Sequence, residues 1–391
     1  MIRYFLLFLF LFVPASVLLA QQRMSKEEAA GLALRNGSML KAPNLSLQQQ
    51  QQLLPGSGGL ESPQLQYQLT PYDEGAQAGV QQTLSFPSVY RSRKLLQSER
   101  IRLAQLQLSV AAYDLKNAVR ISYLQLQYLA EKTRLLAFQD SIYSAIKTSS
   151  KRFFEAGQIN KLEELQASTQ ADAIRNEWRR SEAEREAELQ LFRFYTGYQE
   201  TFLTTEIEPY LFVSSSDTLL TNIQQQILQQ QIAINQGEMQ VAKKSLLPEL
   251  QAAVLFPTIS QHERPVGYQL GLTIPVWQRQ NKSRIAAAST GTAVAKAQAE
   301  LEQLRLLAQY RQTFANFNKE VQSLAYYTTT ALPQAQAIIE TSQRLFQGGE
   351  LNYIESLRNL ATAFTIRNDY LEMLRTYNET VIQLSYLNGT L

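Results

Sequence analysis

The side chains that most often carry enzyme chemistry are nearly missing from this sequence. Among 391 residues there is one His, His262, and there is no Cys. Disulfides, thiolate nucleophiles and thiolate metal sites are therefore excluded, and so is a cluster of several His ligands within one chain. His262 lies beside Glu263, Arg264 and Pro265 in a turn-like segment, and we interpret it as an exposed loop residue. With no nucleophile and base paired by spacing, we expect neither an enzyme nor a resident metal or cofactor.

The polar segments that do stand out occur twice. Residues 154–160 read FEAGQIN and residues 346–352 read FQGGELN, at an offset of 192. Two shorter matches precede them in the same order, residues 84–87 with 272–275 and residues 63–66 with 248–251. Three ordered matches, whose offsets drift by only a few residues, indicate two copies of one structural unit. The unit is far longer than a solenoid repeat.

Long helices are expected to dominate each copy. The stretch 88–153 contains neither Pro nor Gly, and at about 1.5 Å per residue it would span about 100 Å as an α-helix. Leu residues at seven-residue spacing within it predict coiled-coil packing. After a turn at Gly157, a second helix is expected to return to Gly197. The second copy repeats this pattern from about 281 to 346 and back, with a bend expected at Pro333.

Each copy begins with two segments that alternate apolar and polar side chains. Such alternation gives a strand one dry and one wet face, and about 9–11 residues suffice for a tilted strand to cross a bilayer. Two amphipathic hairpins on a soluble core are the alternative interpretation. The strands are expected at about 64–71, 78–87, 249–257 and 266–276.

Residue types at the strand ends favour the membrane interpretation. Aromatic side chains cluster there as in an interfacial girdle, namely Tyr67, Tyr72, Phe86, Tyr90, Phe256, Tyr268 and Trp277. Basic side chains follow at one edge, where they could reach lipid head groups, namely Arg91, Arg93, Lys94, Arg279, Lys282 and Arg284. Because four strands cannot close a barrel and open edges in lipid leave backbone groups unpaired, the chain is expected to self-associate. Two copies would give eight strands and three would give twelve.

The N-terminus has the pattern of an export signal. Residues 1–20 begin with Arg3, continue with an apolar run of about ten residues and end at Ala20. A retained membrane anchor is the alternative, although the run is short for a spanning helix. No later segment has about 18 consecutive apolar residues, so entry into a membrane would use strands. The net charge of only +3 predicts no nucleic-acid partner.

The mature chain, residues 21–391, is interpreted as one elongated protomer. Ser25 and Glu28 predict a capping box at the start of its first helix. Residues 43–63 are expected to be irregular. The Gln run at 48–52 within them is either helix or a flexible segment, and the sequence does not decide between the two. The expected organisation is a first repeat at about 21–200, a connector at 201–221 and a second repeat at about 222–391.

This arrangement resembles the TolC-like outer-membrane efflux family. The resemblance rests on the capped first helix, on the strand pairs that end at Pro87 and Val276, and on the twin turns that follow Phe154 and Phe346. It implies a mainly α fold with a small β part, in which duplicated β-hairpins are followed by very long helical hairpins. It also implies a homotrimer whose 12-stranded β-barrel is continuous with a periplasmic α-helical barrel.

Two features depart from the family pattern, and a third indicates one branch of the family. The segment between Asn36 and Pro63 is short and broken where the family has a longer helix, and the lipid-bearing Cys of some members is missing. The C-terminal segments 349–355, 368–371 and 377–378 are most similar to the branch that serves heavy-metal cation pumps.

The resemblance implies a passive conduit from periplasm to exterior in the outer membrane of a Gram-negative bacterium. Its cargo would be metal cations or small toxic compounds. Its partners would be a periplasmic adaptor (membrane-fusion) protein, an inner-membrane pump of the resistance-nodulation-division type, and outer-membrane lipid. The same architecture serves type I protein secretion, which is the nearest alternative. A non-channel periplasmic coiled-coil adaptor is an alternative of another class.

Within this interpretation the two helical turns form the periplasmic mouth. Gly157 and Gly349 would permit close approach of an adaptor, or they would simply make the turns. Glu163 and Glu355, one turn inside the mouth at equivalent positions, would form a carboxylate ring if they face inward; a solvated helix face is the alternative. The polar contacts offered to an adaptor are Gln158, Asn160, Glu350 and Asn352.

Overall fold

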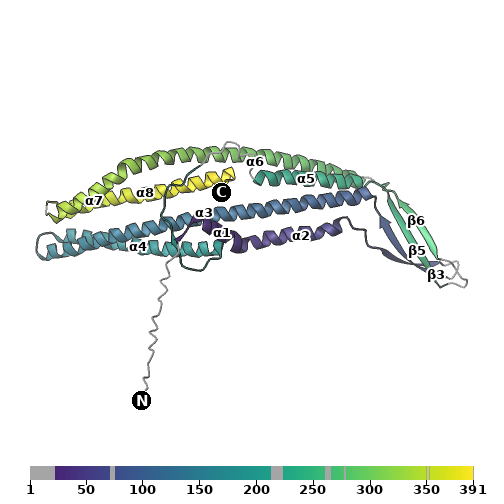
Figure 1. The fold of residues 1–391 in the computed structure, drawn as a ribbon, viewed down its shortest axis with the longest axis horizontal. Coiled ribbons are helices and arrows are strands. Elements are labelled where there is room, and N and C mark those ends of the chain that lie inside the picture. The colour runs from purple at the N-terminus through teal and green to yellow at the C-terminus, as the bar shows by residue number, and fades with distance from the viewer. Residues whose placement is uncertain are drawn as a thin grey trace, which may run out of the picture.

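The protein is a long helical body with a four-stranded sheet at one end (Figure 1). The computed structural model describes residues 23–70, 75–212, 223–259, 266–276, 279–348, 350–351 and 353–390. The expected signal at 1–20, the turn residue His262 and the aromatic residues Tyr72 and Trp277 lie outside the described residues. No helix within the described ranges combines the length and hydropathy that a membrane-spanning helix needs.

The elements run twice in the same order, which confirms the expected mainly α fold with duplicated β-hairpins and long helical hairpins. Near the N-terminus are β1 (Arg23–Met24), α1 (Lys26–Asn36) and the 3₁₀ turn η1 (Ser38–Leu40). The first series is α2 (Lys41–Ser57), β2 (Gln64–Thr70), β3 (Gly75–Leu84), α3 (Pro87–Glu155) and α4 (Lys161–Thr196). After β4 (Leu203–Thr204), the second is α5 (Ile223–Lys244), β5 (Glu249–Ile259), β6 (Gly267–Thr273), α6 (Arg279–Tyr326), η4 (Tyr327–Ala331), α7 (Leu332–Gln347) and α8 (Tyr353–Asn388).

The breaker-free stretch of the first copy forms one unbroken helix of 69 residues, α3. Pro87 lies in its first turn, where a missing N–H costs no helical hydrogen bond. The returning helix α4 ends at Gly197, whose φ of +67° is the left-handed conformation that favours glycine. At the N-terminus the predicted capping box is present, because Ser25 Oγ accepts from the Glu28 N–H and Glu28 accepts from the Ser25 N–H.

The Gln run, which the sequence left undecided, is helical. The expectation that residues 43–63 are irregular was wrong for 43–57, which belong to α2, with Pro55 in its last turn. One buried amide ties it to α3: Gln97 Nε2 donates to the backbone oxygen of Gln50 at 2.9 Å and to its side-chain oxygen at 3.0 Å. The departure expected between Asn36 and Pro63 takes the form of a break, since α1 ends at Asn36 and α2 starts after the 3₁₀ turn.

Regular α-helix is interrupted in the second copy, where Pro333 was expected to disturb it. Tyr327–Ala331 form a π-helical turn, η4, and Pro333 lies in the first turn of α7. Pro333 has no N–H to donate and its ring crowds the preceding turn, which a wider π turn accommodates. The chain changes direction between α6 and α7 (Figure 1). The equivalent part of the first copy lies inside uninterrupted α3.

The four long strands form one antiparallel sheet in the order β2-β3-β5-β6. Its register aligns the alternating patterns of all four strands, because directly paired residues share a face. One row runs Leu65, Val80, Val254, Tyr268, and the adjacent row on the other face runs Gln64, Gln81, Ala253, Gln269. The sheet therefore has one apolar and one largely polar face, as the alternation predicted.

Two of the expected strand ends were wrong. The second strand was extended to residue 87, but β3 ends at Leu84 and Pro87 already belongs to α3. The fourth was extended to residue 276, but β6 ends at Thr273. In both cases a Pro follows closely, Pro87 and Pro275, and Pro cannot donate to a strand ladder.

The described part of the connector, residues 201–212, is held against the helical body by a short strand pair and by hydrogen bonds to α3 and α8. Met24 and Thr204 belong to a two-stranded parallel pair, β1–β4. The buried Tyr123 of α3 anchors this pair, because its hydroxyl donates to the Met24 carbonyl and accepts from the Thr205 N–H. Farther along, the Asn378 side chain of α8 accepts from the Tyr210 N–H and donates to the Glu208 carbonyl, both at 2.8 Å. Of the expected connector 201–221, residues 213–221 lie outside the described part.

Candidate functional site

The two helical hairpins end side by side at the end of the molecule opposite the sheet (Figure 1). In the first turn Gly157 has a φ of +70°, and its N–H donates to the Phe154 carbonyl at 2.9 Å. A side chain added at Gly157 would meet nothing within 4 Å. Gly157 thus makes the turn and leaves open surface above it. Of the two adjacent glycines in the second turn, Gly348 has an ordinary φ of −75°, and Gly349 lies outside the described residues.

The first turn also contains a capping box that the sequence analysis missed. Asn160 Oδ1 accepts from the Glu163 N–H at 3.0 Å, and Glu163 Oε2 accepts from the Asn160 N–H at 3.0 Å. These two residues were expected as an adaptor contact and a ring carboxylate, and here they fix the start of α4. The Asn-x-x-Glu spacing was the available signal, as Ser25 and Glu28 show for α1.

The remaining expected residues lie on the surface of the tip as far as the structure describes them. Gln158 and Glu350 are exposed, and Glu355 is exposed in the first turn of α8. Asn352 lies outside the described residues, although it has the same Asn-x-x-Glu spacing to Glu355 that Asn160 has to Glu163. The tip therefore brings Gln158, Asn160 and Glu163 together on the first hairpin.

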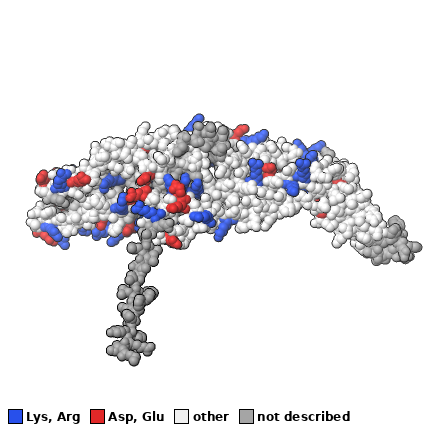
Figure 2. Space-filling model, viewed as in Figure 1, with Lys and Arg blue, Asp and Glu red and all other residues white. Residues whose placement is uncertain are grey.

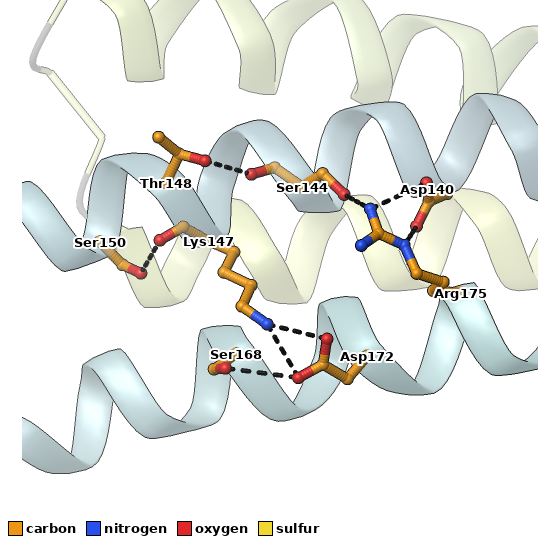
Figure 3. A network of polar contacts seen from close by, with 8 residues as sticks. All are labelled: Asp140, Ser144, Lys147, Thr148, Ser150, Ser168, Asp172 and Arg175. Carbon is orange, nitrogen blue, oxygen red and sulfur yellow. Dashed lines mark hydrogen bonds and ion pairs between the residues drawn. The ribbon is translucent and has the colours of Figure 1, made fainter.

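Ion pairs cross the first hairpin behind its turn (Figure 3). Lys147 Nζ of α3 lies 2.8 Å from both carboxylate oxygens of Asp172 of α4. The Lys147 hydrogen bond lowers the pKa of Asp172 below its usual value. Two turns away, Arg175 donates to Asp140 at 3.2 Å and to Ser144 Oγ at 2.8 Å. Lys147, Asp172 and Arg175 keep much of their surface exposed, whereas Asp140 is only 15% exposed. Ion pairs this open to solvent contribute little stability, so their main effect is on the register of α3 against α4.

An apolar core joins the first hairpin to the second. Phe364 of α8 is 2% exposed, and its ring lies 6.0 Å from the rings of both Phe138 and Tyr143 of α3. Burial raises the pKa of the Tyr143 hydroxyl to about 12. The cluster of buried residues is Tyr143, Ile146, Ala167, Ala171, Ile174, Ala335, Ile339, Leu360, Ala363 and Phe364.

The hairpins meet through faces that are not equivalent. At the offset of 192, Ile339 and Phe364 in the second hairpin correspond to Lys147 and Asp172 in the first. Phe364 is buried against Phe138 and Tyr143 of the first hairpin, and Ile339 is buried in the same cluster, whereas the side chains of Lys147 and Asp172 are 39% and 59% exposed. The contact is therefore heterologous, and it leaves the ion-paired face of the first hairpin uncovered in the single chain.

At the other end of the molecule, the apolar face of the sheet is open to solvent in the single chain. Leu65 is 86% exposed, Tyr268 is 81% exposed and Leu270 is 78% exposed. The outer strands β2 and β6 each pair on one side only within the described sheet. An exposed apolar face with two open edges is a surface that soluble monomers avoid. The described residues contain no group of His, Asp and Glu side chains placed to hold a metal ion.

Comparisons with known proteins rest on structure alone. No protein-family model matches the chain, and no curated protein matches its sequence. Solved structures do match. The outer-membrane channel CmeC of Campylobacter jejuni has a TM-score of 0.79 at 13% identity, covering 93% of this chain and 85% of that one. CusC, whose structures concern transmembrane channel formation, has a TM-score of 0.78 at 14% identity, covering 93% and 91%.

A third match is the outer-membrane protein VceC of Vibrio cholerae, with a TM-score of 0.75 at 12% identity, covering 93% of this chain and 96% of that one. The chain has the fold of the TolC-like outer-membrane channels. Each of these matches covers 93% of this chain, so the shared fold extends over nearly all of it. At 12–14% identity the shared fold does not extend to the roles of individual side chains.

Proposed function

We propose that this chain is the outer-membrane channel of a tripartite efflux system in a Gram-negative bacterium. After removal of residues 1–20, three copies assemble so that their sheets form a 12-stranded barrel in the outer membrane. Their helices extend the passage into the periplasm. A periplasmic adaptor and an inner-membrane pump of the resistance-nodulation-division type complete the system. The cargo is metal cations or small toxic compounds, and the chain itself is a passive conduit without catalysis.

The observation that carries this proposal is the apolar sheet face with open edges on β2 and β6. In lipid, unpaired edge groups cost several kcal/mol each, so the sheet must be continued by another sheet. Further copies of the same chain supply it, edge to edge, and turn the apolar face to lipid and the polar face to an aqueous lumen.

The helical tips support the same assembly. When two hairpins meet through different faces, the pair keeps one unused copy of each face, and these two faces fit each other. Further hairpins can therefore add in the same way, and they form a ring if the rotation closes. Two hairpins in each of three copies would give a ring of six. The uncovered face with Lys147 and Asp172 then lies at the contact between copies.

Membrane fractionation followed by mass measurement of the detergent-solubilised oligomer tests the proposal. We expect the protein in the outer-membrane fraction, extracted only with detergent and with the mass of three chains. Release in buffer alone, as for a soluble periplasmic coiled-coil adaptor, would refute the channel. Increased sensitivity to metal salts in a deletion strain, without a change in protein secretion, is expected if the cargo is metal cations.

Gly157 and Gly349 provide a test of adaptor docking at the tip. A Cβ atom added at Gly157 meets nothing within 4 Å in the chain, although the φ of +70° strains residues other than glycine. A bulky replacement that leaves the oligomer intact therefore reports on contact with a partner. We expect Gly157→Phe together with Gly349→Phe to abolish efflux and adaptor cross-linking while the oligomer mass is unchanged. Asn tolerates a positive φ, so Gly157→Asn is the matched control and is expected to retain efflux. Normal efflux in the double Phe variant would reject docking at these turns.

Glu163 and Glu355 provide a test of charge selectivity in the mouth. Because Gln also completes a capping box, Glu163→Gln removes the charge while keeping the hydrogen bond to Asn160. We expect single-channel recordings of the Glu163→Gln/Glu355→Gln variant to show a several-fold loss of preference for cations over anions. An unchanged ion preference would assign both carboxylates to the helix surface and its caps.

A further inference from the structure

Exposed basic side chains gather where the helical body meets the sheet. Figure 2 shows Lys and Arg side chains near this junction and almost no charge on the adjoining sheet. The exposed ones at the ends of α3, α5 and α6, which we call the basic belt, are Arg91, Lys94, Lys243, Lys244, Arg279, Lys282 and Arg284. None of the seven forms an ion pair with a carboxylate of the described residues.

Acidic side chains are scarce at the same level. Residues 85–98 and 266–299 contain no Asp or Glu at all. The described carboxylates nearest the junction contact residues outside the belt. Glu238, which lines a hollow together with Arg284 of the belt, pairs with Arg100 at 3.0 Å. Glu61 lies 3.8 Å from Arg93, outside the belt, and Glu249 accepts from Ser85 Oγ at 3.2 Å. The belt is therefore a net positive surface that the chain does not neutralise.

The belt also occupies a narrow level along the molecule. Arg91 and Lys94 lie within eight residues of the start of α3, and Arg279 within the first turn of α6. Eight residues of helix correspond to about 12 Å. Arg91 and Lys94 correspond to Arg279 and Lys282 at an offset of 188, so both copies of the structural unit place positive charge at this level.

Continuity with the apolar sheet face identifies the occupant. Leu250 and Leu272 are exposed and pair in one row of the apolar face. They lie near the strand ends that connect to Lys244 of α5 and Arg279 of α6, the helix ends that carry the belt. We propose that the basic belt binds the phosphates of anionic phospholipids, such as phosphatidylglycerol, in the periplasmic leaflet of the outer membrane. This inference rests on the proposed function for the depth of the sheet in the bilayer. The apolar rows determine how deep the barrel lies in the hydrocarbon layer. The basic belt contacts the lipid phosphates at the boundary of that layer and so holds the barrel at this depth.

Native mass spectrometry of the full-length protein in detergent, supplied with equal phosphatidylglycerol and phosphatidylethanolamine, tests the belt. Wild-type oligomer is expected to retain phosphatidylglycerol preferentially. The variant Arg91→Gln/Lys94→Gln/Arg279→Gln/Lys282→Gln is expected to lose that preference by about tenfold or more. The matched control removes the same charge elsewhere on exposed helix surface, and it is expected to bind like wild type: Arg179→Gln/Arg185→Gln/Lys296→Gln/Arg311→Gln.

The outcomes separate the belt from the channel. A membrane-inserted oligomer that binds both lipids equally, or a belt variant with wild-type preference, overturns the lipid site and leaves the channel standing. Equal loss of preference in the control variant also overturns it, because the effect would follow net charge alone. A water-soluble protein that forms no membrane oligomer refutes the proposed function itself.

Discussion

Replacing Leu270 by Arg is expected to prevent assembly in the outer membrane. Leu270 lies in the middle of β6 on the apolar face and is 78% exposed in the single chain. If that face meets lipid, an Arg near the bilayer midplane costs about 2–4 kcal/mol for each copy. The expected result is a strong reduction of the detergent-resistant oligomer and of outer-membrane protein, measured by fractionation and native electrophoresis. Leu65→Arg on β2 is expected to act in the same direction.

The neighbouring residue supplies the control. Gln269 lies on the same strand but on the opposite face, paired with Ala253, so Gln269→Arg places the same charge at the same depth in the aqueous lumen. Wild-type assembly is expected for Gln269→Arg. Equal assembly of Leu270→Arg and Gln269→Arg would show that the apolar face does not meet lipid. If neither variant assembles, β6 does not accept Arg on either face, and the experiment does not distinguish the two faces.

Local sequence patterns predict much of this fold. The strands β2, β3, β5 and β6 follow from the alternation of apolar and polar residues. The helix α3 follows from a long run without Pro or Gly in which Leu recurs at seven-residue spacing. The duplicated order then gives the topology. The strand ends were missed at Pro87 and Pro275 because alternation continues past the last ladder hydrogen bond, and only the missing N–H of Pro marks the end.

Other features depend on contacts that no local pattern contains. The two-residue strands β1 and β4 are held by the Tyr123 hydroxyl, far away in sequence, which bonds to Met24 of β1 and to Thr205, the residue after β4. The helix α2 contains no buried residue, and it is tied to α3 through Gln97. At the tip, the heterologous contact could not be read from the repeats, because similarity of the two hairpins suggests equivalent faces rather than the different ones that meet.

Phe364→Ala is expected to lower the stability of the helical tip by about 3–5 kcal/mol, the usual cost of removing a buried Phe side chain. Phe364 is 2% exposed and joins α8 to α3 through Phe138 and Tyr143, so the cavity opens at the contact between hairpins. Circular dichroism during denaturant unfolding is expected to show an earlier loss of helix. Phe364→Leu, which retains most of the volume, is expected to cost about 1 kcal/mol.

The equivalent position of the first hairpin supplies the comparison. Asp172 corresponds to Phe364 at the offset of 192, but it forms only an exposed ion pair with Lys147. Asp172→Ala is therefore expected to shift the unfolding midpoint far less than Phe364→Ala. Similar midpoints for the two variants would contradict the heterologous contact, because they would mean that the two positions are equally buried in the assembled protein. A large effect of Phe364→Ala with a small effect of Asp172→Ala would place the more stable contact between the two hairpins of one chain. The ion-paired face, whose contact costs less to break, would then lie between chains.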